Sequence, residues 1–318
     1  MLALSGGSDS GAYGAGFLNG WSASGARPTF SIVSGVSTGA LIAPFAFLGP
    51  AYDPVLRSLY TQTFASDVFT IRPVPAGLLG SSFADTSPLQ RRISELVTPK
   101  LLAAIAREHA EGRRLYVVTT NLDAQRAVVW NMGEIASRPH PNSLAVFRQV
   151  LLASTAVPGL FAPVLIDVEA SGRRFQEMHA DGGTITQFLS VTEWLLVGSR
   201  PLPRGISLTQ YVLINKKLEP EFAVVDNKTL QIVSRGFATI IKANTRSSVL
   251  STFNYARHNR VRLRLTYIGA DFTLKDDKPF DPAYMGALFD YGYRRGVSGT
   301  SWIDASHGRQ EGAFSASR

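Results

Sequence analysis

Short apolar runs alternate with stretches of helical apolar spacing along most of the chain. Residues 2–5 form an apolar run that stops at a pair of glycines, and helix-compatible residues 12–21 follow after a small-residue stretch. Residues 30–33 form a second run, which a turn of small residues separates from an apolar helical stretch over 40–47. The pattern therefore predicts strand, turn and helix in succession, twice.

The rest of the chain continues this alternation without a repeat, a low-complexity block or a linker. We therefore expect one domain over residues 1–305, followed by a frayed polar tail over 306–318. The helix predicted over 225–255 has a candidate break at 243–244. Further strands are predicted at 115–120, 127–130, 162–166, 174–176, 210–214 and 262–267, and further helices at 53–64, 143–152 and 281–296.

The composition is that of a compact globular protein, with 45% hydrophobic and 18% charged residues among 318. A formal charge of +8 favours contact with anionic surfaces. The basic residues are scattered and form no run typical of a nucleic-acid-binding arm, so no nucleic-acid partner is expected. The absence of cysteine excludes disulfides, a thiolate nucleophile and cysteine-ligated metals, and we expect no metal or cofactor.

Membrane-spanning and export signals are weak in this sequence. No run approaches the ~20 apolar residues that a transmembrane helix needs. Residues 1–4 are too short for a signal peptide, because glycines follow at once. We therefore expect a protein that is soluble or peripherally attached to a membrane.

A Gly-x-Ser-x-Gly pattern at residues 35–39 is the first candidate for chemistry. It follows an apolar run and precedes an apolar helix, which is the context of a strand-to-helix turn that exposes a nucleophilic serine. Ser37 is therefore the candidate nucleophile. The alternative is a close-packed turn in which Ser37 or Thr38 only caps the helix.

The glycine-rich stretch at residues 5–11 could supply the second requirement of ester cleavage. Backbone N–H groups at the start of a helix stabilise the oxyanion of a tetrahedral intermediate. Gly6, Gly7 and Ser8 are the candidate donors. A nucleotide-binding loop and a plain turn are the alternatives, although the dinucleotide order of glycines and a Gly-Lys-Ser/Thr sequence are both missing.

Together with two later motifs, these residues resemble the bacterial patatin-like phospholipases. Residues 153–163 look like that family's Ala-Ser-x-Ala-x-Pro-x-x-Phe block, and Asp181-Gly182-Gly183 looks like its Asp-Gly-Gly/Ala motif. The four motifs occur in the family's order over residues 2–183. The resemblance implies a three-layer α/β/α sandwich with a central, mostly parallel sheet. It also implies a Ser37–Asp181 dyad that works without histidine.

In such a dyad Asp181 would accept the serine proton and later activate water. An ordinary carboxylate is too weak a base for this, so we predict that burial raises the pKa of Asp181. The loop departs from the family's usual Gly-Gly-Gly-x-Arg-Gly, because Ser8 replaces the third glycine and Ser10 replaces the arginine. A cation beside the site is thereby lost, and Asp9 would add a negative charge nearby.

Histidines offer alternatives to the dyad. His179 lies two residues before Asp181, so on a strand both side chains share a face, and His179 is either a triad-like accessory residue or a structural histidine. His258 and His307 follow Asp181, which makes the Ser-Asp-His order of α/β-hydrolases formally available. Neither has a recognisable local motif.

The resemblance implies a lipid acyl hydrolase that acts on phospholipids or other acyl esters, with peripheral contact to an anionic membrane surface. The apolar segment at 76–83 is either buried or part of an acyl-chain entrance or lid. Two alternatives remain. One is a short-chain carboxylesterase or thioesterase, and the other is a catalytically silent lipid-binding protein on the same scaffold.

Overall fold

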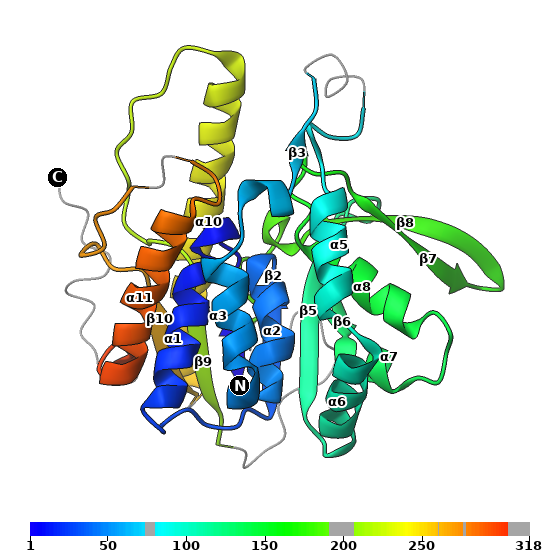
Figure 1. The fold of residues 1–318 in the computed structure, drawn as a ribbon, viewed down its shortest axis with the longest axis horizontal. Coiled ribbons are helices and arrows are strands. Elements are labelled where there is room, and N and C mark those ends of the chain that lie inside the picture. The colour runs from blue at the N-terminus through cyan, green and yellow to red at the C-terminus, as the bar shows by residue number, and fades with distance from the viewer. Residues whose placement is uncertain (74–79, 191–206, 260, 276–277, 305–318) are drawn as a thin grey trace.

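A nine-stranded mixed sheet forms the centre of the protein (Figure 1). The computed structural model describes residues 1–73, 80–190, 207–259, 261–275 and 278–304. The five central strands are parallel neighbours, and the other four pair antiparallel. In spatial order the strands are β11 (Ile303–Asp304), β10 (Arg262–Tyr267), β9 (Thr209–Ile214), β1 (Leu2–Leu4), β2 (Ile32–Val36), β5 (Arg114–Asn121), β8 (Arg173–Asp181) and β7 (Val164–Ala170), with β6 (Arg126–Asn131) also paired to β5.

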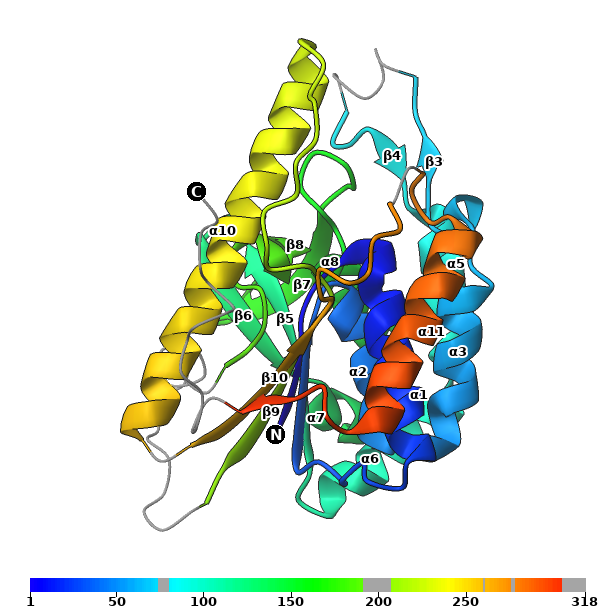
Figure 2. The ribbon, with the colours of Figure 1, turned by 90° about the vertical axis from the view of Figure 1, so that its left-hand side faces the viewer.

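Helices cover both faces of the sheet, which confirms the predicted three-layer α/β/α sandwich. Figure 2 shows α10 (Thr229–His258) on one face and α1, α2, α3 and α11 on the other. The more populated layer consists of α1 (Gly11–Ala23), α2 (Thr38–Leu48), α3 (Asp53–Thr61), α5 (Ser87–Leu96), α6 (Pro99–Ala110), α7 (Met132–Ser137), α8 (Ser143–Ser154) and α11 (Pro282–Ser298). None of the described helices combines the length and apolar character needed to cross a bilayer.

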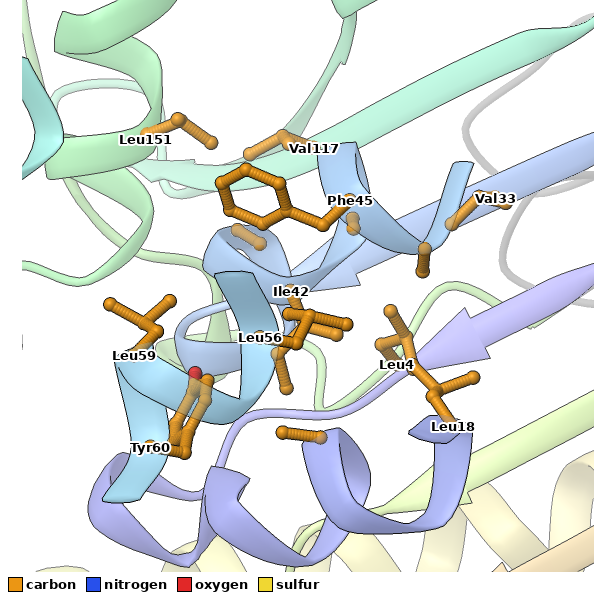
Figure 3. Close-up of a cluster of buried hydrophobic side chains, with 14 of the residues drawn as sticks. Leu4, Leu18, Val33, Ile42, Phe45, Leu56, Leu59, Tyr60, Val117 and Leu151 are labelled. Carbon is orange, nitrogen blue, oxygen red and sulfur yellow. The ribbon is translucent and has the colours of Figure 1, made fainter. Parts of the chain in front are cut away.

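The alternation of side chains along the strands separates two main cores. Leu2 and Leu4 of β1 belong to the large cluster under the populated helical layer, whereas Ala3 belongs to the cluster under α10. This is the period-2 geometry of a strand that is buried on both faces. Figure 3 shows Leu4 and Leu18 near Ile42 and Leu56 in the large cluster, so β1, α1, α2 and α3 share one core.

Most predicted elements are confirmed, with corrections at their boundaries. α10 runs unbroken through 243–244, and β8 continues past the predicted 174–176 as far as Asp181. α5 and α6 were not predicted, and neither were two short strands, β3 (Thr70–Ile71) and β4 (Ala84–Asp85), on either side of the apolar segment that begins at residue 76. Residues 76–79 and the predicted tail lie outside the described residues.

Candidate active site

Ser37 lies in a sharp turn between β2 and α2, at the carboxyl edge of the sheet. Its φ of 56° and ψ of −126° are sparsely populated for a residue with a side chain. The flanking glycines allow this turn because a Cβ on Gly35 would lie 2.2 Å from the Gly39 carbonyl oxygen, and a Cβ on Gly39 would lie 2.4 Å from the Leu4 carbonyl oxygen. The Gly-x-Ser-x-Gly spacing therefore reflects close packing of α2 on both strands.

Two hydrogen bonds orient Ser37. Its hydroxyl donates to Asp181 Oδ2 at 2.6 Å. Its backbone N–H donates to Ser154 Oγ at 3.0 Å, and Ser154 in turn donates to the Val118 carbonyl at 2.7 Å. The end of α8 and strand β5 thus hold the turn from one side, while the carboxylate of Asp181 meets the hydroxyl from the other.

Asp181 is the last residue of β8 and is buried. A Cβ on Gly182 would lie 2.4 Å from the Val118 carbonyl oxygen, so the chain can turn here only because residue 182 is glycine. The Gly183 N–H donates to Asp181 Oδ1 at 2.6 Å. Each carboxylate oxygen of Asp181 therefore has a defined role, one fixing the turn and the other accepting from Ser37.

Burial raises the pKa of Asp181 from its ordinary 3.8 to about 6, in the predicted direction. The hydrogen bonds from Ser37 and Gly183 and the positive charge of Lys216 act in the opposite direction, because they stabilise the carboxylate. Asp181 is therefore ionised at neutral pH but is a stronger base than an exposed aspartate.

The glycine-rich loop lies against Ser37 from the end of β1. A Cβ on Gly6 would lie 3.0 Å from Ser37 Cβ, and a Cβ on Gly7 would lie 2.2 Å from the Asn215 carbonyl oxygen. The Gly6 N–H already donates to the Gln187 carbonyl at 3.3 Å. Within the described residues, the N–H groups of Gly7 and Ser8 have no acceptor, so these two of the three predicted donors are available to a ligand.

Two polar residues of this loop, Ser10 and Asp9, have different positions. Ser10 lines the cavity in front of Ser37, and its hydroxyl lies 3.4 Å from Tyr284 Oη. Asp9 is buried, is not among the residues lining that cavity, and accepts the Phe280 N–H at 2.9 Å. Its carboxylate fixes the segment before α11, and its negative charge still acts on Tyr60, which lines the cavity.

A cavity of about 400 Å³ opens in front of Ser37 and Asp181. Its polar end carries the glycine-rich loop, Gln187 and Lys216, and most of its remaining wall is apolar. Burial lowers the pKa of Lys216 to about 8, while Asp181 favours its charged form. The apolar wall consists of Leu41, Leu59, Val68, Leu89, Val157, Phe161, Phe237, Ala238, Ile241, Ile268, Phe280 and Met285.

The two described candidate histidines, His179 and His258, do not line the cavity. His179 is fully buried, its Nδ1 lies 2.9 Å from Thr119 Oγ1 and its Nε2 lies 3.2 Å from Glu177 Oε2. Burial lowers its pKa, and it is not among the residues lining the cavity. His258 ends α10 and contacts the Asn254 carbonyl, and His307 lies outside the described residues. Across the described part of the chain, no three histidine, aspartate or glutamate side chains are grouped to hold a metal ion.

The sequence model of the patatin-like phospholipases matches residues 2–190, which include every motif of this site. The chain belongs to the patatin-like phospholipase family. Membership supports lipid acyl hydrolase activity in the broad sense and lipid esters as the class of substrate. It does not by itself assign a role to any residue.

Other comparisons add little to the family assignment. No curated protein sequence matches the chain. Among solved structures, the chain is similar to the crystal structure of VipD from Legionella pneumophila, with 14% identity and a TM-score of 0.45, over 95% of this chain and 67% of that one.

Three further residues of this patatin-like site were not predicted from the sequence. Gln187 accepts from Lys216 Nζ at 2.6 Å and donates to the Gly183 carbonyl at 2.6 Å, so it links the Asp181 turn to the end of β9. Asn215 accepts the Gly14 N–H and donates to the Ser5 carbonyl, which fixes the glycine-rich loop. Only their positions after a motif or a strand could have drawn attention to them.

Proposed function

We propose that this protein is a lipid acyl hydrolase in which Ser37 is the nucleophile and Asp181 is the general base. The observation that carries the proposal is the 2.6 Å hydrogen bond from Ser37 Oγ to a buried carboxylate, in a turn that presents the serine to an apolar cavity. The raised pKa of Asp181 supports it, because a stronger base accepts the serine proton more readily.

The proposed reaction has two halves. Ser37 Oγ attacks the ester carbonyl while Asp181 takes its proton, and the N–H groups of Gly7 and Ser8 stabilise the resulting oxyanion. Asp181 then gives the proton to the leaving alcohol, which leaves the acyl group on Ser37. In the second half a water molecule transfers a proton to Asp181 and attacks the acyl-enzyme, and the fatty acid is released when the proton returns to Ser37.

The cavity favours a fatty acyl chain over an acetyl or butyryl group. Its volume of about 400 Å³ is larger than a short acyl group could fill, and its wall is largely apolar. The runner-up is a short-chain carboxylesterase or thioesterase, and hydrolysis of p-nitrophenyl esters from acetyl to palmitoyl separates the two. We expect kcat/KM to rise with chain length, whereas an optimum at acetyl or butyryl would favour the runner-up.

Covalent labelling tests the nucleophile directly. A fluorophosphonate is expected to form a single adduct on the peptide that contains Ser37, detected by mass spectrometry, and to abolish ester hydrolysis in proportion to labelling. Labelling of another serine would contradict the proposal. Vesicle binding without labelling or turnover would instead favour the catalytically silent lipid-binding protein.

We also propose that the amino-terminal half of α10 and the segment before it contact the membrane. Phe222 and Val224 are 92% and 85% exposed, and Ile232, Val233 and Ile240 are also exposed on the helix that supplies one wall of the cavity. Figure 1 shows this end of α10 projecting beyond the sheet. Apolar side chains at the rim of a lipid-binding cavity are suited to the headgroup region of a bilayer.

Vesicle sedimentation tests this contact. The double variant Phe222→Ser/Val224→Ser is expected to bind vesicles of phosphatidylcholine and phosphatidylglycerol about tenfold more weakly, because two apolar side chains no longer leave water. Val297→Ser is the control, since Val297 is also an exposed apolar residue. It is 44% exposed near the carboxyl end of α11, outside the proposed contact. Equal binding of all three proteins would contradict the proposed contact.

A further inference from the structure

Lys216 is held beside the glycine-rich loop by the topology of the sheet. β9 pairs in parallel with β1, so the ends of both strands lie at the same edge, and Lys216 follows β9 after a single residue. That residue, Asn215, binds the loop at Ser5 and the following helix α1 at Gly14. Lys216 therefore lines the same cavity as Ser37, at its polar end.

Among the cations that line the cavity, Lys216 differs from the others in its partner. Lys217 and Lys242 both pair with Glu221, at 3.7 Å and 2.6 Å. Arg92 pairs with Glu95 at 3.2 Å. Within the described residues no carboxylate lies within 4.0 Å of the Lys216 ammonium, which donates instead to the neutral amide oxygen of Gln187. Its positive charge is therefore not neutralised by direct contact.

The ammonium group of Lys216 retains capacity for a ligand. It has three N–H donors, and among the residues that the structure describes only Gln187 accepts from it. Burial lowers its pKa to about 8, so most molecules keep the charge at neutral pH. The charge of Asp181 favours the ammonium from a distance but does not contact it, and an anionic oxygen of a bound substrate in direct contact would offset more of the cost of burial.

We propose that Lys216 binds the phosphate of a glycerophospholipid substrate and makes the enzyme prefer phosphate-bearing acyl esters over neutral ones. This inference rests on the proposed function. In a glycerophospholipid the phosphate and the scissile ester belong to one glycerol unit, so a cation in the cavity of Ser37 is placed to reach it. The loop itself brings Ser10, not a cation, to the wall of the cavity.

The test compares two substrates with the same acyl chain, lysophosphatidylglycerol and monoacylglycerol, in micelles of a neutral detergent. Lys216→Met keeps the apolar stem and removes the ammonium group. We expect it to lower the ratio of kcat/KM for the two substrates about 10- to 100-fold, since one charge-assisted interaction with phosphate is lost. A ratio, unlike an absolute rate, is unaffected by partial loss of folded enzyme.

Two variants control for other effects. Lys217→Met removes a neighbouring cation that already pairs with Glu221, and the ratio is expected to change less than about threefold. Lys216→Arg keeps a cation and should retain the preference for phosphate. An unchanged ratio in Lys216→Met, or an equal loss on both substrates, would overturn the inference and leave Lys216 a residue that only supports the Asp181 turn.

A binding measurement keeps the inference separate from the proposed function. In a Ser37→Ala background, an ether analogue of the lysophospholipid should bind at least about tenfold more tightly than the matching alkylglycerol, and Lys216→Met should remove that difference. Failure of every ester to react would sink the hydrolase proposal but not this result. Equal binding of the two ether lipids by the Ser37→Ala protein would sink the phosphate site alone.

Discussion

Ser37→Ala is expected to lower kcat/KM for ester hydrolysis by at least about 10⁴-fold, because the proposed acyl-enzyme forms on the oxygen that this substitution removes. The substitution removes the oxygen that donates to Asp181 Oδ2 at 2.6 Å, while alanine meets the same backbone requirement at a φ of 56°. The fold should therefore survive, which thermal unfolding followed by circular dichroism can verify alongside the rates.

Ser34→Ala is the matched control for this variant. Ser34 lies on β2, the strand that leads into the Ser37 turn. It is fully buried, and its hydroxyl has no hydrogen-bond partner in the described part of the chain. Removing it should leave kcat/KM within about threefold and stability near that of the parent protein. Retention of more than about 1% of activity in Ser37→Ala would refute the assignment of the nucleophile.

Asp181→Asn is the second variant with a large expected effect, a loss of about 10³- to 10⁵-fold in kcat/KM. An amide has nearly the shape of the carboxylate but cannot accept the serine proton.

In the parent protein kcat/KM should fall as pH decreases through about 6, because protonation of Asp181 removes the base. The same acid limb is expected in His179→Ala, since His179 contacts Thr119, Glu177 and the Trp130 ring and does not line the cavity. Loss of that limb in His179→Ala would identify the histidine as the base.

The same substitution is expected to stabilise the fold. The pKa of Asp181 is about 6 in the folded protein and close to 3.8 when unfolded, so the folded state binds more protons between these values. The free energy of unfolding therefore decreases as pH rises from about 4 to 6, and the full penalty of about 3 kcal/mol persists above that range. Asparagine carries no such penalty.

Asp181→Asn should consequently unfold at a higher temperature than the parent protein at pH 8, and the difference should shrink towards pH 4. Urea unfolding at both pH values measures the two free energies. If the variant is instead less stable than the parent at pH 8, the ionised carboxylate of Asp181 does not destabilise the folded protein. The burial that raises its pKa would then not lower the free energy of unfolding.

The sequence predicted the parts of this site that are contiguous in the chain. The turn at Ser37 was recognisable because its glycines, the preceding strand and the following helix are adjacent in sequence. The burial of Asp181 was predictable only through the resemblance, since the first six residues of β8 are mostly exposed and only its end, which pairs with β5, is buried.

Residues brought in by tertiary pairing could not be predicted in the same way. Lys216 reaches the site because β9 inserts between β1 and β10, and no local pattern specifies the order of strands in a sheet. Gln187 follows the Asp-Gly-Gly motif, but its contacts with Gly6 and Lys216 depend on segments far away in the chain. The helices α5 and α6 are different, because the amphipathic spacing of their apolar residues is present in the sequence and is sufficient to predict them.

One wall of the cavity belongs to a helix that is anchored at one end. α10 is 30 residues long, about 45 Å, and its side chains Val249 and Phe253 are buried in the core under the sheet. Phe237 and Ile241, which face the cavity, come from the half that has little buried surface. The carboxyl-terminal half of α10 is therefore fixed by the core, whereas the amino-terminal half is not. A small tilt of the amino-terminal half would widen the cavity for a bulkier lipid without separating the packed strands.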